Sequence, residues 1–253
     1  MSEPVITAVI PARYASSRFP GKPLTPIAGK AMIQHVWKRV KQTRTIGRII
    51  VATDDARVRD AVTAFGGEAM MTRGEHRSGT ERVAEVATHL SGGDADIFIN
   101  VQGDEPLIDP AALDALVAEM AGDEEIRLGT LCSVIGRAEE IMDPNVVKVV
   151  RDFDGDALYF SRAPVPWVRD RHPEIEVRHL KHIGVYAYRR EALLEYPALP
   201  PGELERIEQL EQLRWLENGF HMRVVECEYD PVSVDVPGDV AKVEARIRDA
   251  ASG

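Results

Sequence analysis

The chain has 253 residues, of which 44% are hydrophobic and 28% are charged. This composition is ordinary for a soluble globular protein, and the length suits one or two α/β domains. No apolar run is long enough for a transmembrane helix and the N-terminus lacks a signal-peptide pattern, so we expect a cytoplasmic protein. The net charge of −10 disfavours a dedicated nucleic-acid binder. Cys132 and Cys227 are expected to be free thiols rather than a disulfide.

Positive charge is concentrated at the start of the chain. Residues 1–53 contain nine Lys or Arg and one acid, Glu3, so they carry +8 and the remaining 200 residues carry −18. A buried strand is predicted over residues 5–10, and it leads into a loop over residues 11–23. The cations of this loop are Arg13, Arg18 and Lys22. Cations at the carboxyl end of a first strand indicate an anionic ligand, and a polyphosphate is the natural candidate.

The alternative is that these cations are solvated surface charges, which are common. Ser16, Ser17 and Gly21 in the same loop weigh against it, because hydroxyl and backbone N–H groups bind phosphate and glycine permits close approach. The loop is not a common phosphate motif, since the sequence has no G-x-G-x-x-G and neither Gly-Lys pair has Walker-loop flanks. Nicotinamide dehydrogenases and P-loop ATPases are therefore disfavoured.

Apolar residues recur at helical spacing in three segments of the first half. These segments are residues 32–40, 58–65 and 80–90. Gly66 and Gly67 are expected to close the second helix, and Thr80 is a candidate cap for the third.

Strands are predicted between these helices, over residues 48–53 and 96–101. The alternation predicts an α/β fold with a largely parallel sheet and helices on both faces. Ligands of such sheets bind beyond the carboxyl ends of the strands, where the basic loop and Asp104 both fall.

The second half has a different pattern. Residues 146–150 and 157–160 read as a hairpin around a turn that contains Gly155. Further predictions are a mobile loop over residues 163–174, a strand over 182–188 and one helix over 203–217. We interpret residues 1–253 as a single domain with a β-rich insertion within about residues 146–190.

Asp104 follows a predicted strand, so its carboxylate is expected at the ligand edge of the sheet. Beside cations and an anionic ligand it would suit Mg²⁺, which prefers one or two carboxylates with substrate phosphates and water. A turn acid bonded to local backbone is the alternative. Asp235, at another predicted strand end, is the candidate second ligand, and His182 on pattern alone is most simply a core histidine. The pattern alone indicates a Mg²⁺-assisted enzyme acting on a nucleotide or another polyphosphate.

Several segments together are more specific than any one of them. They are residues 10–24 (IPARYASSRFPGKPL), 51–54 (VATD), 76–82 (HRSGTER), 100–106 (NVQGDEP), 159–163 (YFSRA), 182–188 (HIGVYAY) and 210–214 (LEQLR). With these segments the chain resembles the 3-deoxy-manno-octulosonate cytidylyltransferase family, the CMP-Kdo synthetases, nearly end to end. The first loop alone is shared by many sugar nucleotidyltransferases, whereas SGTER and QGDEP together are far more specific.

The resemblance implies a Rossmann-like nucleotide-diphospho-sugar transferase fold. It also implies that CMP is transferred from CTP to the anomeric hydroxyl of 3-deoxy-D-manno-octulosonate (Kdo), giving CMP-Kdo and pyrophosphate for lipopolysaccharide biosynthesis. The implied protein is a cytoplasmic homodimer of a Gram-negative cell, with the dimer contact in the hairpin region after Val146.

The resemblance further implies roles for individual residues. Catalysis would rest on Arg13, Arg18, Lys22 and Asp104, with Mg²⁺ on Asp104 and Asp235. The nucleotide would lie among Arg13, Ser16, Lys22, Ser78, Gly79, Thr80 and Gln102. The acid sugar would lie among Arg162, His182, Tyr186, Glu211 and Gln212.

Three other functions remain open at this point. The nearest is a cytidylyltransferase for another acid sugar, such as 8-amino-Kdo or a sialic acid. A glycosyltransferase on a similar fold would be expected to show Asp-x-Asp where this chain has Gly103-Asp104-Glu105. A nucleic-acid-binding face in the basic first segment would predict steeply salt-dependent binding, and the absence of interleaved aromatic residues disfavours it.

Overall fold

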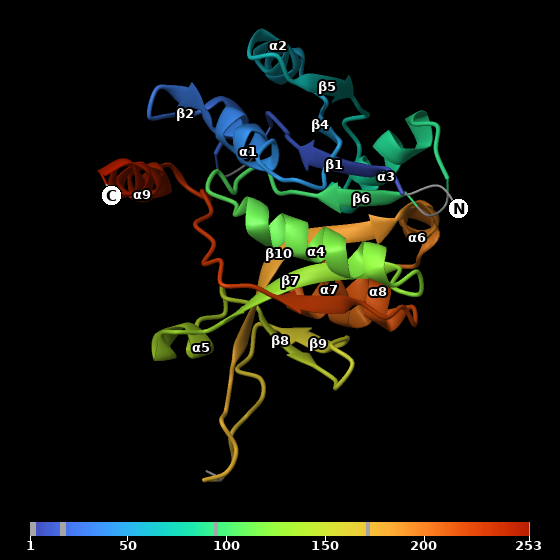
Figure 1. The fold of residues 1–253 in the computed structure, drawn as a ribbon, viewed down its shortest axis with the longest axis vertical. Helices are drawn as coiled ribbons and strands as arrows, with labels where there is room; N and C mark the ends of the chain where they lie inside the picture. Colours follow the sequence, from blue (N-terminus) through green and yellow to red (C-terminus); the bar gives the residue numbers. More distant parts are fainter. Residues whose placement is uncertain (1–3, 16–18, 94–95, 171–172, 253) are drawn as a thin grey trace.

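The computed structural model describes residues 4–15, 19–93, 96–170 and 173–252. Within these residues a mixed sheet of nine strands runs through the molecule, with helices on either side of it (Figure 1). The strand order along the main path is β11-β7-β10-β6-β1-β4-β5, and β8 and β9 branch from β10. Residues 16–18 lie outside the described part, and with them Ser16, Ser17 and Arg18 of the basic loop.

One half of the sheet is parallel, as the alternation of strands and helices predicts. Its strands are β1 (Ile6–Pro11), β4 (Arg48–Thr53), β5 (Glu68–Met71) and β6 (Ile97–Asn100). The strand β1 pairs in parallel with β4 on one side and β6 on the other, and β4 pairs in parallel with β5. The carboxyl ends of β1 and β6 therefore meet at the same edge of the sheet.

Two hydrophobic cores lie on opposite faces of this sheet. Ala8 and Ile10 of β1 belong to one core and Val9 to the other, since successive side chains of a strand alternate between faces. The first core is covered by α1 (Met32–Val40), α2 (Ala56–Ala64) and α4 (Pro110–Gly122), and the second by α3 (Gly79–His89), α6 (Arg190–Glu195) and α8 (Leu213–Glu217). Helices on both faces are thus confirmed.

The helix starts follow local capping chemistry, with one difference from expectation. Asp55 caps α2 by accepting a hydrogen bond from the backbone N–H of Arg57. The cap of α3 is Ser78 rather than Thr80: the Ser78 Oγ accepts from the N–H of Glu81 at 3.2 Å, and Thr80 lies inside the first turn. Because Ser78 accepts from this N–H group, the Thr80 hydroxyl is available for a contact with Tyr188.

The other half of the sheet is antiparallel around β10 (Leu180–Arg189). This strand pairs with β6 on one side and with β7 (Leu128–Val134) on the other, and β11 (Arg223–Glu226) runs parallel to β7 at the edge. Cys132 is buried in β7 and Cys227 follows β11; both are free thiols, as predicted.

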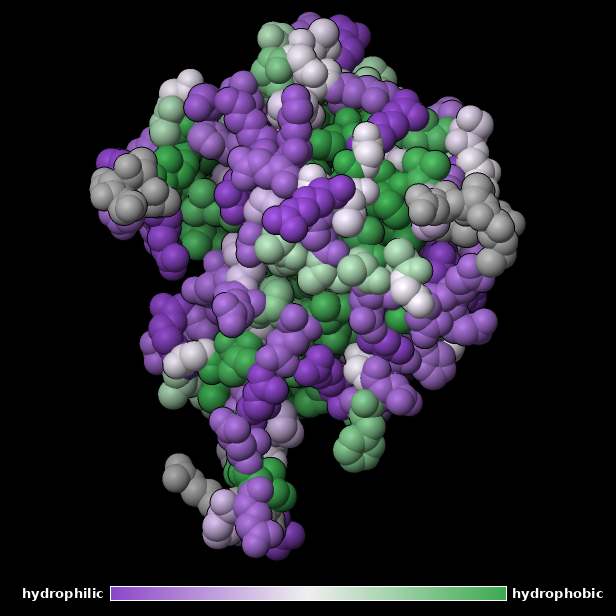
Figure 2. Space-filling view, in the orientation of Figure 1, coloured by the Kyte–Doolittle hydropathy of each residue, from purple (hydrophilic) through white to green (hydrophobic). Residues whose placement is uncertain are grey.

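The predicted hairpin is confirmed as β8 (Lys148–Arg151) and β9 (Ala157–Ser161). The segment between β9 and β10 forms no helix or strand where it is described, and it projects from the body of the molecule (Figure 1). Apolar side chains are exposed on this projecting end (Figure 2). The largest of them on the hairpin and the segment are Phe153, Leu158, Trp167 and Ile175.

The remaining elements are short, apart from the last helix. They are β2 (Pro26–Ile27), β3 (Lys30–Ala31), α5 (Ala138–Met142), the 3₁₀ turns η1 (Lys22–Leu24), η2 (Tyr196–Ala198) and η3 (Pro237–Asp239), and α9 (Val240–Ser252). A third small core joins α9 to β2 through Val243 and Ile27. Within the described residues, no helix combines the length and the apolar character needed to cross a membrane.

The single helix expected over residues 203–217 is wrong. The structure has α7 (Glu203–Glu208) and α8 (Leu213–Glu217), separated by a break at which Gln209 adopts the left-handed conformation with φ 54°. The predicted apolar face is not buried as one surface, because Leu213 is buried whereas Ile207 is 69% exposed. Apolar periodicity could not reveal the break, because the break depends on contacts that Arg162 makes from a distant part of the chain.

Candidate active site

The basic loop and the Asp104 loop enclose a cavity of about 340 Å³ at the carboxyl edge of β1 and β6. Arg13 and Lys22 line one side, and Gln102, Gly103 and Asp104 line the other. Gly103 lets the two loops touch, since a β-carbon there would lie 2.7 Å from the carbonyl oxygen of Pro11. The structure therefore brings together the residues that the sequence placed at the ends of two separate strands.

Arg13 carries a hydrogen-bond donor that no described residue satisfies. Its Nη2 is buried without a partner, although buried polar groups are almost always hydrogen-bonded. Arg13 also lines the cavity, and a guanidinium suits an anionic ligand with several oxygens, such as a polyphosphate.

Asp104 and Asp235 converge on the ammonium group of Lys22. The Lys22 Nζ lies 2.7 Å from Asp104 Oδ2 and 3.8 Å from Asp235 Oδ1. Asp235 was expected at the end of a strand, but the structure places it in the segment between β11 and η3. This segment is held against the Asp104 loop because the N–H of Val234 donates to the Asp104 carbonyl oxygen at 3.0 Å and the Val234 side chain is fully buried.

The carboxylate oxygens of Asp104 and Asp235 already flank the positive charge of Lys22, and oxygens of this kind are the ligands that a hard cation prefers. The described residues contain no group of three or more His, Cys, Asp or Glu side chains arranged to hold a metal ion. A site with two carboxylates leaves positions for phosphate oxygens and water, which is the pattern Mg²⁺ prefers in nucleotide sites.

Glu105, next to Asp104, was missed by the reading of the sequence. It is 9% exposed, and Tyr229 Oη donates to its Oε2 at 3.0 Å. Burial, and secondarily the neighbouring Asp104 charge, raise the pKa of the Glu105 carboxyl to about 8. Only its place in the QGDEP segment hinted at a role, because burial cannot be read from a charged residue in a loop.

The start of α3 packs on the ends of β1 and β6. A β-carbon at Gly79 would lie 3.5 Å from Asn100 Nδ2 and 3.8 Å from the Pro11 ring, which are ordinary van der Waals contacts and show how closely this turn approaches both strands. The Thr80 hydroxyl lies 3.0 Å from Tyr188 Oη. Ser78, Gly79 and Thr80 thus reach the same sheet edge as the basic loop.

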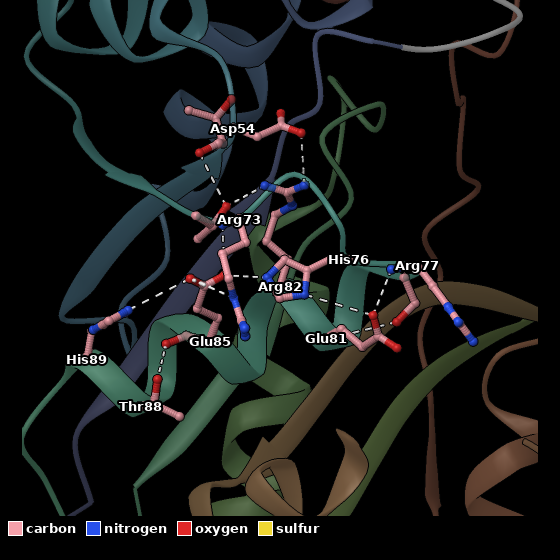
Figure 3. Close-up of polar contacts among 12 residues, drawn as sticks. Asp54, Arg73, His76, Arg77, Glu81, Arg82, Glu85, Thr88 and His89 are labelled. Atoms are coloured by element: carbon pink, nitrogen blue, oxygen red, sulfur yellow. Dashed lines mark hydrogen bonds and ion pairs between the residues drawn. The ribbon is translucent and has the colours of Figure 1, made fainter. Parts of the chain in front are cut away.

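An ion-pair network fixes the loop that precedes α3 (Figure 3). Arg82 is fully buried and points from α3 to Asp54 after β4, with Nη2 3.4 Å from Asp54 Oδ2. The His76 ring contacts the Glu85 carboxylate through Nε2. On its other side the ring approaches Glu81, with Nδ1 3.9 Å from the carboxylate. The network joins residues from the VATD and HRSGTER segments, and it holds the first turn of α3 in place.

A second, larger cavity of about 820 Å³ meets the first at the carboxylate pair, since Asp104 lines the first cavity and Asp235 lines the second. His182, Tyr186 and Gln212 line it, and so do Asp235 of the carboxylate pair and Glu105, the neighbour of Asp104 in the chain. Tyr186 Oη donates to Gln212 Oε1 at 3.1 Å, while the Gln212 Nε2 is buried without a partner among the described residues. The cavity also contains cations that the sequence reading missed, namely Arg137, Lys181, Lys242 and Arg246.

Two residues expected around the acid sugar are not among those lining this cavity. The Arg162 guanidinium donates to backbone carbonyl oxygens, with Nε 2.7 Å from that of Glu208 and Nη1 2.8 Å from that of Pro144. Glu211 accepts from the N–H of Thr80 at 3.3 Å, so it lies at the start of α3 instead. Burial raises the pKa of the Glu211 carboxyl.

His182 is a half-buried side chain that packs against two aromatic rings at the wall of this cavity. Its ring lies 5.0 Å from that of Phe160 and 5.5 Å from that of Tyr186, and its Nε2 is 3.0 Å from Thr130 Oγ1. Burial lowers the pKa of His182 to about 3 from its ordinary 6.5.

This lowered pKa predicts a loss of stability in acid. The unfolded chain binds a proton at His182 below pH 6.5, whereas the folded chain does so only near pH 3. The free energy of unfolding therefore has its full value above pH 6.5 and decreases as the pH falls from 6.5 towards 3. The expected slope from this residue is at most about 1.4 kcal/mol per pH unit. Urea unfolding at a series of pH values between 7 and about 4 gives the free energy of unfolding of the wild type and of His182→Gln. The contribution of His182 is the difference between the two slopes of this free energy against pH. Equal slopes would contradict the assignment.

Known proteins are similar to this chain over nearly its whole length. The cytidylyltransferase family profile matches residues 7–226. A 3-deoxy-manno-octulosonate cytidylyltransferase of Geobacter metallireducens is 50% identical over 250 residues, covering 96% of this chain and 97% of that protein. That of Syntrophotalea carbinolica is 51% identical over 249 residues, covering 96% and 98%.

Solved structures agree. A CMP:2-keto-3-deoxy-manno-octonic acid synthetase complexed with CTP superposes with a TM-score of 0.91 at 46% identity, covering 97% of this chain and 99% of that one. The 4-diphosphocytidyl-2C-methyl-D-erythritol synthase of Anaerococcus prevotii shares the fold alone, with a TM-score of 0.64 at 13% identity, covering 98% of this chain and 100% of that one.

The fold and the site define a nucleotidyltransferase, on the nucleotide-diphospho-sugar transferase fold that the sequence motifs implied. Within that class, the chain belongs to the 3-deoxy-manno-octulosonate cytidylyltransferase family.

Proposed function

We propose that the chain transfers CMP from CTP to the anomeric hydroxyl of Kdo, giving CMP-Kdo and pyrophosphate for lipopolysaccharide biosynthesis. The observation that carries this proposal is the position of Lys22. Its ammonium lies between Asp104 and Asp235, where the cavity lined by the basic loop adjoins the cavity lined by His182, Tyr186 and Gln212. Two substrates bound in these cavities meet at this group.

The triphosphate binds in the smaller cavity. Arg13 and Lys22 supply positive charge and donors, and Gln102 lines the opposite wall. The nucleoside lies towards Ser78, Gly79 and Thr80 at the start of α3. Arg18 and Ser16 belong to the same loop and are assigned here by the sequence motif alone.

Asp104 and Asp235 are the residues that would hold Mg²⁺. When bound, the ion neutralises charge on the phosphates and on the departing pyrophosphate. Lys22 is salt-bridged to both carboxylates, so an ion held there would take its place and leave the ammonium for the phosphates. Pyrophosphate release should accordingly stop on chelation of divalent ions and return on addition of Mg²⁺.

The acceptor binds in the larger cavity. Its hydroxyls pair with Tyr186 and with the unpartnered Nε2 of Gln212. Cations also line this cavity, and each of them is paired there with an acid, as Lys181 is with Glu140. The anomeric oxygen attacks the α-phosphorus, the bond to the bridging oxygen breaks, and the hydroxyl proton passes to solvent. His182, with a pKa of about 3, is too weak a base to take this proton at neutral pH and serves as a neutral hydrogen-bonding group.

The test is pyrophosphate release from CTP, Mg²⁺ and an acid sugar. Parallel reactions contain Kdo, 8-amino-Kdo or a sialic acid, and omit CTP or the acceptor in turn. Release that requires both CTP and Kdo is expected. Release only with another acid sugar would keep the chemistry and overturn the acceptor, and no release with any of them from folded protein would overturn the nucleotidyltransferase assignment.

We further propose that the chain is a single domain of a cytoplasmic homodimer, with the β-rich insertion within about residues 146–190 at the contact. Phe153 and Leu158 on the hairpin and Trp167 on the segment after it support this proposal, since large apolar side chains exposed in one region favour a protein contact. Light scattering of the wild type and of Phe153→Asp tests the proposed dimer. The wild type should have twice the mass of one chain, and the charge in Phe153→Asp should shift this mass towards that of one chain. A monomeric wild type would overturn the proposal.

A further inference from the structure

The segment that carries Asp235 has no regular secondary structure of its own. It runs from the end of β11 at Glu226 to the start of η3 at Pro237, and no helix or strand hydrogen bonds fix where it lies. Its position must therefore come from contacts with other parts of the chain. These contacts also set the distance between the carboxylates of Asp235 and Asp104, and hence the geometry of the proposed Mg²⁺ site.

Two hydrogen bonds tie this segment to the loop that carries Asp104. At one point the N–H of Val234 donates to the Asp104 carbonyl oxygen at 3.0 Å, and the Val234 side chain is buried in the third core. At the other point Tyr229 Oη donates to Glu105 Oε2 at 3.0 Å. The two bonds end on neighbouring residues of one loop, and Asp235 directly follows Val234.

The Tyr229 hydroxyl bridges the segment and the loop. The Tyr229 ring packs against the first hydrophobic core. Burial, and then the charge of Glu105, raise the pKa of the hydroxyl, so it is a donor at neutral pH. A hydrogen bond from the backbone of Val232 acts on this pKa in the opposite direction, which places Val232 at the same oxygen. One hydroxyl thus contacts both the segment of Asp235 and the loop of Asp104.

Glu105 is a firm anchor for this hydroxyl. Its side chain is 9% exposed, and it lines the larger cavity together with Asp235. Its backbone is fixed in a turn, because its N–H donates to the Gln102 carbonyl oxygen at 3.3 Å and its carbonyl oxygen accepts from Ile108 at 3.1 Å. Loss of the Tyr229 bond would leave a buried carboxyl group without this donor, which is unfavourable.

We propose that Tyr229 is a positioning residue for the metal site: its hydrogen bond to Glu105 holds the Asp235 carboxylate at the distance from Asp104 that a divalent cation requires. The inference rests on the proposed function for the assignment of the cation to these two carboxylates. Groups that hold metal ligands in place change metal affinity about 10- to 100-fold when they are removed.

The first test is Tyr229→Phe, which removes the hydroxyl and keeps the ring. Calorimetry measures CTP binding without acceptor, once in excess Mg²⁺ and once with a chelator. The dissociation constant of the Mg²⁺–CTP complex should rise about tenfold. That of metal-free CTP should stay at the wild-type value, since Tyr229 is not among the described residues that line the smaller cavity. Unchanged affinity for Mg²⁺–CTP would overturn the proposal.

The second test asks whether Tyr229 acts through Glu105. Glu105→Gln keeps a carbonyl oxygen that accepts from Tyr229, so most of the affinity for Mg²⁺–CTP should remain. Glu105→Leu removes the acceptor and should weaken binding about tenfold, and adding Tyr229→Phe should weaken it no further, because both changes remove one contact. Additive losses would overturn the proposal. So would equal losses in Glu105→Gln and Glu105→Leu, which are expected if Glu105 itself binds the cation.

Kinetics separate positioning from a direct part in the reaction. The Mg²⁺ concentration that gives half the maximal rate should rise about tenfold in Tyr229→Phe, while kcat at saturating Mg²⁺ should stay close to that of the wild type. A lower kcat with unchanged affinity for Mg²⁺–CTP would place Tyr229 in the reaction itself and overturn the proposal. Glu228→Gln changes an exposed neighbour in the same segment and should alter neither quantity.

The outcomes for the wild type separate this inference from its premises. A wild type that turns over no acid sugar would overturn the proposed function, whereas binding of Mg²⁺–CTP would still test the role of Tyr229. A wild type that binds CTP equally well with and without Mg²⁺ would remove the cation from Asp104 and Asp235, and the role of Tyr229 with it.

Discussion

Replacing Asp104 by asparagine should lower the rate of Mg²⁺-dependent pyrophosphate release about a thousandfold, with the fold intact. Asparagine has the same shape but no charge, and a carboxylate that holds a divalent ion contributes several kcal/mol to the stability of the charged transition state. The side chain is 29% exposed at a cavity edge, and its carbonyl contact with Val234 is a backbone one that the substitution keeps. Initial rates at saturating CTP and Kdo, over a series of Mg²⁺ concentrations, measure the effect.

Asp60→Asn is the matched control. Asp60 is exposed on α2 and its partner is the neighbouring Arg59, so its charge lies on the surface and the rate should be that of the wild type. A rate for Asp104→Asn near that of the control would remove Asp104 from the metal site. Thermal unfolding of both variants establishes that a lost rate is not a lost fold.

Replacing Lys22 by alanine should lower kcat roughly a hundredfold and raise the dissociation constant for CTP by less than tenfold. Negative charge increases on the α-phosphate and on the leaving pyrophosphate during transfer, so an ammonium at this position stabilises the transition state more than the bound substrate. Lys22 is well placed for this, because its Nζ lies where the two cavities adjoin and its side chain is only 15% exposed. Steady-state kinetics and CTP calorimetry measure the two effects separately.

Lys30→Ala serves as the control, since Lys30 is an exposed cation in β3 of the same basic segment. Both of its constants should match the wild type. An effect of Lys22→Ala confined to CTP affinity would demote Lys22 to a binding residue, and equal effects of the two variants would mean that only the general positive charge of the first segment matters. Lys22→Arg should keep part of the rate, because it retains the charge with a different shape.

The sequence predicted much of the fold because the evidence for it was local. Apolar spacing located α1, α2 and α3, and the alternation with short apolar runs gave the parallel order of β1, β4 and β6. The basic loop and Asp104 were expected at one edge because the carboxyl ends of parallel strands meet there, and the cavity of Arg13, Lys22 and Asp104 confirms that they do. Family motifs, rather than periodicity, pointed to His182, Tyr186 and Gln212.

Other features could not be predicted because they arise from contacts between distant segments. Asp235 reaches Lys22 through the bond from Val234 to the Asp104 carbonyl, not through the strand end that was expected. The helix over residues 203–217 is broken because Arg162, some 47 residues away, binds the carbonyl groups where α7 ends. The apolar spacing continued through the break and gave no sign of it.

The sequence by itself determined the alternating elements, the family and the edge of the sheet at which the basic loop and Asp104 come together, because these follow from periodicities and motifs within a few residues. Only the tertiary structure decided that Arg162 anchors a turn instead of lining a cavity, and that Glu211 serves the start of α3. It also set the surroundings that lower the pKa of His182 and raise the pKa of Glu105. These properties depend on burial and on partners far away in the chain, and a side chain's desolvation is set by what packs around it rather than by its own type.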